Sequence, residues 1–347
     1  MTTLLTGATG YLGAAVLERS LEYGGRNIRC LVRPGASRAH LLALQSRHGR
    51  GAIEIMEGTL TRRRDVERAL VGVQLVMHLA ASLRGAAADI FLNTVVGSQN
   101  LYDAIAHSAV HRLVTTSSLS VYDLCDVPTA ALVKESTALD PHPERRDAYT
   151  HSKIRQEQLL GALVMRPGVA CIVLRPGPLY GRGGTPLPSR IGLRFPGFLL
   201  QLGGGAPLPL SYIDNCAEAV RLAAFDTRVP PGAYNVVDDA MPTASEYLAR
   251  YRREVRPLRV VRLPFAGTEL LAQLNESSHR ASRGQIPLLL TPYRARNMWR
   301  GHRYDTTRLI VAGWRPPVPT DEALDLAFGV WRDGQRGGSS APAMVSR

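Results

Sequence analysis

Apolar and amphipathic segments alternate along the first half of the chain. Strand-length apolar runs recur at residues 4–6, 28–32, 53–57, 75–81, 112–116 and 170–174. Helical patterns lie between them, at 14–18, 65–70, 93–106 and 149–160. Strands that alternate with helices favour a parallel sheet covered by helices on both faces. We therefore predict an α/β fold with a Rossmann-type, doubly wound parallel sheet.

The pattern changes after residue 180 and then returns. Residues 181–205 are rich in Gly, Pro and Leu, whereas 212–225 is again helical in pattern and 233–237 is again strand-like. We predict a dinucleotide-binding domain from 1–180 with 212–238, a smaller C-terminal substrate-binding domain from 181–211 with 239–332, and a mobile tail at 333–347. Several apolar residues of the smaller domain either contact a hydrophobic substrate or line its core: Phe195, Phe198, Leu199 and Leu200.

The first strand runs directly into a glycine-rich turn and then into a helix. The spacing is G-x-x-G-x-x-G at Gly7, Gly10 and Gly13. Gly7 suits the tight turn, Gly10 admits a pyrophosphate close to the main chain, and Gly13 allows the helix to pack against the strand. Free N–H groups at a helix start bind phosphate. The turn therefore predicts a dinucleotide site formed by Gly7, Thr9, Gly10, Tyr11, Leu12 and Gly13.

Composition narrows the partners of the chain. Its 347 residues carry a net charge of +13, nearly all from arginine, because Lys134 and Lys153 are its only two lysines. The arginines are scattered, with local density at 250–262 and 280–308, and lack the aromatic interleaving typical of a nucleic-acid groove. This argues against nucleic-acid binding and suits a phosphorylated cofactor, an anionic substrate or an acidic carrier partner. The four cysteines fit no metal or disulfide spacing. With no leading signal segment and no membrane-spanning apolar run, we expect a cytoplasmic protein.

Cofactor choice depends on the residue that follows the second strand. An acidic residue there holds the ribose 2′-hydroxyl of NAD, whereas an arginine holds the 2′-phosphate of NADP. Arg33 occupies this position and Arg38 follows closely. We predict NADP, with NAD as the alternative if Arg33 is an ordinary surface arginine.

Tyr149 and Lys153 lie four residues apart in a helical pattern, so both side chains project from one face. A Y-x-x-x-K match is common by chance. Here it uses one of the chain's two lysines, at a place where a cationic point charge is needed.

Taken with the glycine turn, these features resemble the extended short-chain dehydrogenases/reductases, of the NAD(P)-dependent epimerase/dehydratase and 3β-hydroxysteroid dehydrogenase type. The matching segments follow the family's order along most of the chain: Gly7–Gly13, His78–Ala81, Asn93–Leu101, Ser117–Tyr122, Tyr149 with Lys153, Leu174–Gly181, Tyr212–Asn215, Tyr304-Asp305 and Gly313-Trp314.

The resemblance implies a Ser-Tyr-Lys site. Tyr149 is then the general acid/base, Ser118 binds the substrate oxygen, and Lys153 lowers the pKa of Tyr149 and holds the nicotinamide ribose. Ser117 and Ser120 are alternatives for the active hydroxyl, but the family's spacing favours Ser118. Asn93 either supports a proton relay or orients the sheet. Further cofactor contacts are implied at Leu60, Leu79, Ala80, Ala81, Thr116, Tyr149, Pro176 and Leu179.

Departures from the family's pattern reduce the number of reaction types that we expect. Leu119-Ser120 stands where sugar dehydratases of the family have an acidic pair, which argues against dehydration. Leu208–Ser211 stands where many nucleotide-sugar enzymes have an Arg-Asp pair, which weakens the nucleotide-sugar interpretation, although Arg190 or Arg194 is available as a substitute. We expect an NADP-dependent oxidoreductase that interconverts a carbonyl and a secondary alcohol on a moderately large small-molecule substrate that is partly apolar or anionic. The alternative is an NAD-retaining sugar epimerase. A homodimer through the helices beginning near Asn93 and Tyr149 is also implied.

Overall fold

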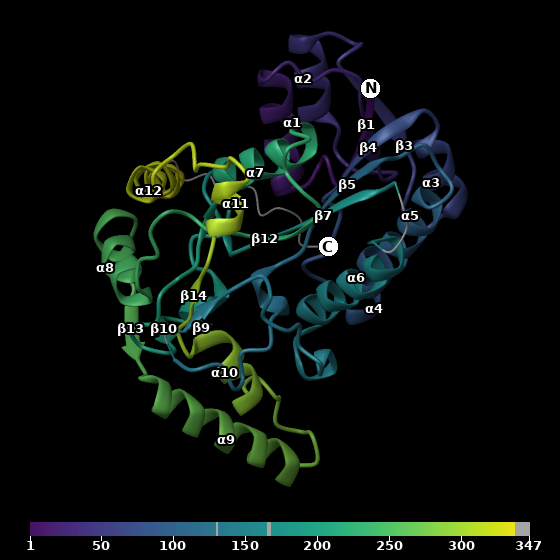
Figure 1. Ribbon diagram of the computed structural model, residues 1–347. Coiled ribbons are helices and arrows are strands. Elements are labelled where there is room, and N and C mark those ends of the chain that lie inside the picture. Colours follow the sequence, from purple (N-terminus) through teal and green to yellow (C-terminus); the bar gives the residue numbers. More distant parts are fainter. Residues whose placement is uncertain (130, 165–167, 337–347) are drawn as a thin grey trace.

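The computed structural model describes residues 1–129, 131–164 and 168–336 (Figure 1). Seven parallel strands form the central sheet in the order β12-β7-β5-β4-β1-β2-β3. They are β1 (Thr2–Thr6), β2 (Ile28–Val32), β3 (Ile53–Glu57), β4 (Val73–His78), β5 (Arg112–Thr116), β7 (Ala170–Pro176) and β12 (Gly232–Val236). The strand order reverses between β1 and β4, which creates a crevice at the carboxyl ends of these strands. The predicted Rossmann-type α/β fold is confirmed.

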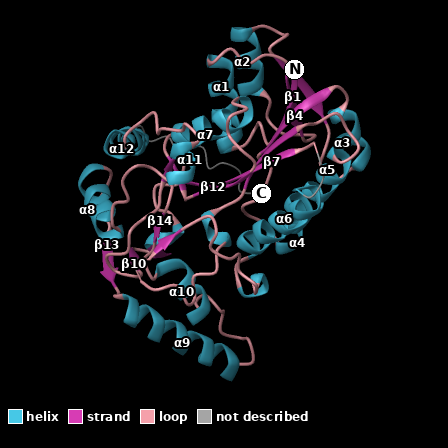
Figure 2. Cartoon of the chain, viewed as in Figure 1, coloured by secondary structure: helices cyan, strands magenta, loops and turns pink. Residues whose placement is uncertain are grey.

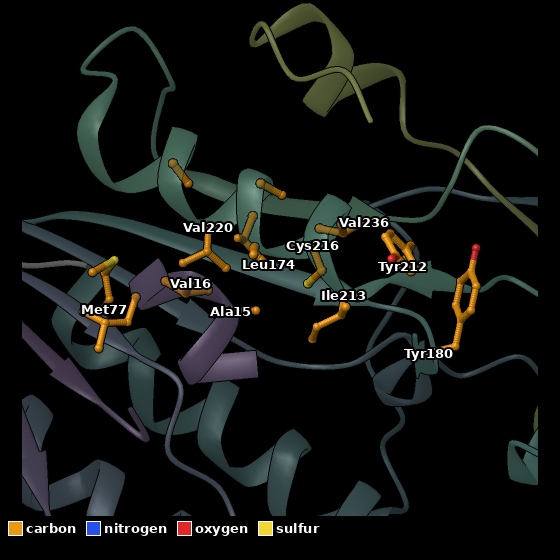
Figure 3. Packing of buried hydrophobic residues seen from close by; sticks show 14 of the residues in the cluster. Ala15, Val16, Met77, Leu174, Tyr180, Tyr212, Ile213, Cys216, Val220 and Val236 are labelled. Carbon is orange, nitrogen blue, oxygen red and sulfur yellow. The ribbon is translucent and has the colours of Figure 1, made fainter. Parts of the chain in front are cut away.

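Helices cover both faces of this sheet. One face carries α1 (Tyr11–Glu22), α2 (Ala39–His48) and α7 (Ile213–Phe225), and the other carries α3 (Arg63–Leu70), α5 (Gly97–Ile105) and α6 (Ala148–Val164). Successive strand residues point to opposite faces, so Leu5 and Met77 pack under α1 and α7 while Leu4 and Val76 pack under α3 and α5. Figure 3 shows part of the apolar cluster between the sheet and the face that carries α1 and α7, in which Val16, Val220 and Leu174 come together.

Two of the differences between predicted and observed elements lie next to the crevice. The strand expected at 75–81 ends at His78, because its neighbours β1 and β5 end beside it and the backbone ladder stops there. The helix expected at 93–106 begins earlier and contains a wider turn: α4 (Ala87–Phe91) leads into a π-helical turn, η1 (Leu92–Val96), before α5. This turn places the Thr94 hydroxyl where it accepts the Ser82 N–H at 3.0 Å.

The remaining elements lie mostly beyond the carboxyl end of the sheet (Figure 2). The strands are β6 (Leu132–Val133) with β14 (Arg303–Tyr304), β8 (Leu179–Tyr180) with β11 (Ser211–Tyr212), and β9 (Gly192–Phe195), β10 (Phe198–Gln201) and β13 (Arg259–Arg262). The helices are α8 (Ala244–Glu254), α9 (Phe265–Ala281), α10 (Pro292–Trp299), α11 (Thr307–Val311) and α12 (Thr320–Arg336). Short 3-10 turns occur at η2 (Leu119–Val121), η3 (Pro143–Arg145) and η4 (Ser189–Ile191).

The apolar residues of the β9–β10 hairpin have two different environments. Leu199 is buried and Leu200 packs against a small cluster with Ala272 and Trp299, so both line the core. Phe195 and Phe198 stack on each other with ring centroids 5.0 Å apart and remain partly exposed.

The C-terminal segment is described in part. Of the expected tail, residues 333–336 complete α12, and residues 337–347 lie outside the described residues. None of the helices in the described ranges is both long and apolar enough to cross a lipid bilayer.

Candidate active site

The glycine turn after β1 is required by close backbone contacts. Gly7 has φ +79°, and a Cβ there would lie 2.8 Å from the Ala80 nitrogen. A Cβ at Gly13 would lie 2.0 Å from the Gly7 oxygen, so α1 packs directly on the turn. Gly10 is exposed at the start of α1, and among the described residues no side chain caps this helix at that position. An exposed, uncapped helix start beside glycine backbone fits a dinucleotide phosphate.

The arginines after β2 differ in their contacts. Arg33 directly follows β2, is exposed, and has no carboxylate partner among the residues that the structure describes. Arg38 forms an ion pair with Glu57 at the end of β3. Of these two arginines, Arg33 is therefore the one whose charge is not compensated by a carboxylate in the described structure.

The other predicted cofactor residues lie along the same carboxyl edge. Leu60 follows β3, the segment 79–81 follows β4, Thr116 ends β5, and Pro176 ends β7 with Leu179 just beyond it. Tyr11 begins α1 beside Thr9, Gly10 and Leu12, and its hydroxyl lies under the 183–184 turn, where a Cβ on Gly184 would be 2.7 Å away.

Ser118 and Tyr149 come together beyond the end of β5. The Ser118 Oγ accepts hydrogen bonds from the Ser120 N–H at 3.1 Å and the Ser120 hydroxyl at 3.0 Å. Burial raises the pKa of Tyr149 to about 12, a hydrogen bond with Ser118 lowers it, and Asp147 raises it further. The phenol is therefore protonated at neutral pH.

Lys153 is buried one helical turn beyond Tyr149. Its Nζ donates to the Thr116 carbonyl and to Gln156 Oε1, both at 2.9 Å. Burial lowers the pKa of Lys153 to about 8, against an opposing effect of Glu157. The group that lowers the pKa of Tyr149 in this structure is Ser118. The effect of Lys153 on Tyr149 that the resemblance implies stays a prediction.

A buried chain of hydrogen bonds continues from Lys153 to the glycine turn. Gln156 Nε2 donates to Ser98 Oγ at 2.9 Å, Ser98 Oγ lies 2.8 Å from His78 Nε2, and His78 Nδ1 lies 2.8 Å from Thr6 Oγ1. The chain joins α6, α5, β4 and β1. Sequence reasoning missed Gln156, although its position three residues after Lys153 places it on the same helical face.

His78 makes the stability of the protein depend on pH. Burial, with a smaller effect of Lys153, lowers the pKa of His78 to about 3, whereas an unfolded histidine titrates near 6.5. Between these values the unfolded chain binds more protons, so stability falls as pH decreases below 6.5. We expect urea denaturation to show that the parent loses about 2 kcal/mol more than a His78→Gln variant between pH 7 and pH 5. Equal losses in both proteins would contradict this assignment.

A second buried network connects the Ser118–Ser120 segment to α10. Arg146 donates to the Ser120 carbonyl at 2.8 Å and to Asp140 at 2.9 Å, and the Tyr293 hydroxyl donates to the same carboxylate. The Arg146 and Asp140 side chains are 4% and 0% exposed. Asp140 and Tyr293 are 153 residues apart along the chain, and the sequence carries no signal that pairs them.

Three further predicted residues are held by contacts within the protein or lie at its surface. Asn93 donates to the Asp89 carbonyl at 2.8 Å within its own helix. Arg190 donates to the Tyr304 hydroxyl at 3.3 Å and to the Met298 carbonyl at 3.4 Å, while Arg194 is exposed on β9.

Comparison with known proteins identifies related sequences. Residues 3–236 match the model of the NAD dependent epimerase/dehydratase family. The chain is 30% identical, over 81% of its length and 81% of the relative's, to 4-hydroxy-2-methyl-3-oxo-4-farnesyl-3,4-dihydroquinoline-1-oxide ketoreductase of Stigmatella aurantiaca. It is 25% identical to the 2-alkyl-3-oxoalkanoate reductase of Shewanella oneidensis, over 87% of this chain and 78% of that protein.

Solved structures share the fold. The UDP-glucose 4-epimerase of Thermus thermophilus, in complex with NAD, superposes with a TM-score of 0.67 at 21% identity, covering 96% of this chain and 99% of that one. At this identity the likeness concerns the fold alone.

Proposed function

The chain belongs to the NAD-dependent epimerase/dehydratase family of extended short-chain dehydrogenases/reductases, and we propose that it is an NADP-dependent oxidoreductase that interconverts a carbonyl and a secondary alcohol. The contact between Tyr149 and Ser118 carries this proposal. A phenol that keeps its proton at neutral pH and is hydrogen-bonded to a serine is suited to protonate a carbonyl oxygen as it is reduced.

The proposed roles follow from these contacts. Bound NADPH would supply the hydride for the carbonyl carbon. Tyr149 donates its proton to the carbonyl oxygen, and Ser118 donates a hydrogen bond that holds this oxygen in line. Lys153, buried beside Thr116, binds the nicotinamide ribose, and the chain through Gln156, Ser98 and His78 keeps its ammonium in place.

The substrate we propose is a partly apolar ketone. Residues 181–211 and 239–332 would bind it, and Leu119-Ser120 lacks the carboxylates that dehydration of a sugar needs. The names of two relatives support this choice, since they describe reductases of a farnesyl-bearing ketone and of 2-alkyl-3-oxoalkanoates.

Cofactor titration tests the proposal directly. We expect NADPH to bind at least about tenfold more tightly than NADH, a difference of about 1.4 kcal/mol, and an Arg33→Ala variant to lose this preference. Arg50→Ala is the matched control. Arg50 is also exposed, but it precedes β3 and so lies at the amino end of the parallel strands, opposite the carboxyl end where Arg33 lies. Fluorescence of the bound dihydronicotinamide gives both affinities. NAD that is preferred, or that co-purifies with the protein, would favour the sugar epimerase instead.

We also infer that the protein is a homodimer through α4, η1, α5 and α6. Leu92 and Val96 on η1 are 47% and 40% exposed and lie four residues apart, so both can contribute to one apolar contact surface. Sedimentation of the parent should give a dimer mass. A Leu92→Asp/Val96→Asp variant should dissociate at least about tenfold more readily, since it places charges in an apolar contact. Leu42→Asp on α2 is the control, and a parent monomer at all concentrations would refute the dimer.

A further inference from the structure

Large apolar side chains are exposed around α9, which is the outermost helix of the molecule (Figure 1). Leu270 and Leu274, four residues apart on α9, are each 57% exposed. Three more follow in the segment after the helix: Ile286 at 44%, Leu288 at 38% and Leu289 at 57% exposed. We call these five residues the α9 patch. Exposed apolar groups of this kind mark interaction surfaces.

The segment that carries three of the five patch residues is fixed to the helix. Asn275 donates to the Pro287 carbonyl at 3.0 Å, and its Oδ1 accepts the N–H groups of Leu289 and Leu290 at 3.0 and 2.9 Å. His279 Nδ1 lies 2.6 Å from the Ile286 carbonyl. These contacts hold the apolar side chains along α9, so the patch is a built surface.

The charge around the patch is strongly positive. Residues 259–303 contain eight arginines and only two carboxylates. Both carboxylates are already paired, Glu276 with Arg280 and Glu269 with Arg296, each at 2.6 Å. Exposed arginines such as Arg262 and Arg283 therefore add uncompensated positive charge beside the leucines.

We propose that the α9 patch docks on the surface of an anionic phospholipid bilayer. Apolar side chains that enter the headgroup boundary, flanked by arginines that contact lipid phosphates, are the features of an interfacial membrane contact. A second copy of the chain is a poorer partner, because a two-fold contact would bring the same arginines against one another. The proposal rests on this surface and is independent of the proposed reaction.

The position of the patch also suits an apolar substrate. α9 packs against α10, and α10 reaches the Ser118–Ser120 segment through Tyr293, Asp140 and Arg146. The docked face is thus connected to the Ser118–Ser120 segment through α10 and the Asp140–Arg146 pair.

Vesicle co-sedimentation tests the docking surface. The full chain should bind phosphatidylcholine vesicles that contain about 30 mol% phosphatidylglycerol, and bind pure phosphatidylcholine vesicles at least about tenfold more weakly. A Leu270→Ser/Leu274→Ser/Leu289→Ser variant should lose about tenfold or more of this binding. The matched control is Leu42→Ser/Leu132→Ser/Leu326→Ser, whose leucines are 53%, 51% and 48% exposed on α2, β6 and α12.

Three results would overturn the proposal. The first is that the parent protein binds neither kind of vesicle. The second is that the patch variant binds phosphatidylglycerol vesicles as well as the control variant does. The third is that the patch variant instead abolishes a self-association that the parent shows by sedimentation. The control variant also separates docking from the general attraction between a protein of net charge +13 and an anionic surface.

Discussion

Replacing Tyr149 by phenylalanine is expected to lower kcat for ketone reduction by about 10²–10⁴-fold. The variant keeps the ring and its packing but removes the proton that the substrate oxygen needs. Burial raises the pKa of this phenol to about 12, so it is a proton donor throughout the physiological pH range. Single-turnover oxidation of NADPH with a 2-alkyl-3-oxoalkanoate as test ketone measures the effect.

Two comparisons separate catalysis from binding in this experiment. NADPH affinity, measured by fluorescence, should stay within about threefold of the parent, since the proposed partner of the phenol hydroxyl is the substrate oxygen. Tyr23→Phe is the matched control, because Tyr23 is 60% exposed beyond the end of α1, away from the candidate site. A Tyr149→Phe variant as active as this control would refute the role of Tyr149.

Replacing Arg175 by methionine is expected to lower the free energy of unfolding by about 3–5 kcal/mol. The Arg175 guanidinium donates to both oxygens of Glu157, at 3.0 and 2.6 Å, and to the Tyr122 hydroxyl at 2.9 Å. Each side chain of the ion pair is only 7% exposed. Tyr122 in turn donates to Asn235 at 2.6 Å, so the pair connects β7, α6 and β12. The substitution leaves the Glu157 carboxylate buried without its partner.

Denaturant unfolding measures this loss and isolates its cause. An Arg175→Met/Glu157→Leu double variant should recover most of the stability, because it removes both buried charges together. Arg63→Met is the control: the Arg63–Glu67 pair is 66% and 52% exposed, and its loss should cost at most about 0.5 kcal/mol. If the double variant were as unstable as Arg175→Met, packing rather than charge would explain the loss.

The sequence by itself determined the central sheet and the glycine-rich turn that follows β1. The predicted strand segments coincide with β2, β3 and β5 to the residue. β2 and β5 lie inside the parallel sheet and are buried almost throughout, whereas β3, at the edge of the sheet, alternates apolar residues with exposed Glu54 and Glu57. Gly7 adopts φ +79° in the turn, and Gly13 packs directly on the Gly7 oxygen within the same strand-turn-helix unit. Such features depend on local conformation, so they are readable without knowing the rest of the fold.

Tertiary structure alone decided how the candidate site is supported. Gln156, Ser98 and His78 come from three elements, and only their packing makes them one buried chain that ends at Lys153. The same holds for Tyr293, whose partner Asp140 is 153 residues away in sequence. The α9 patch is apolar like any core segment, and only the folded chain leaves it exposed. Each of these depends on which distant surfaces meet, and residue pattern along the chain does not encode that directly.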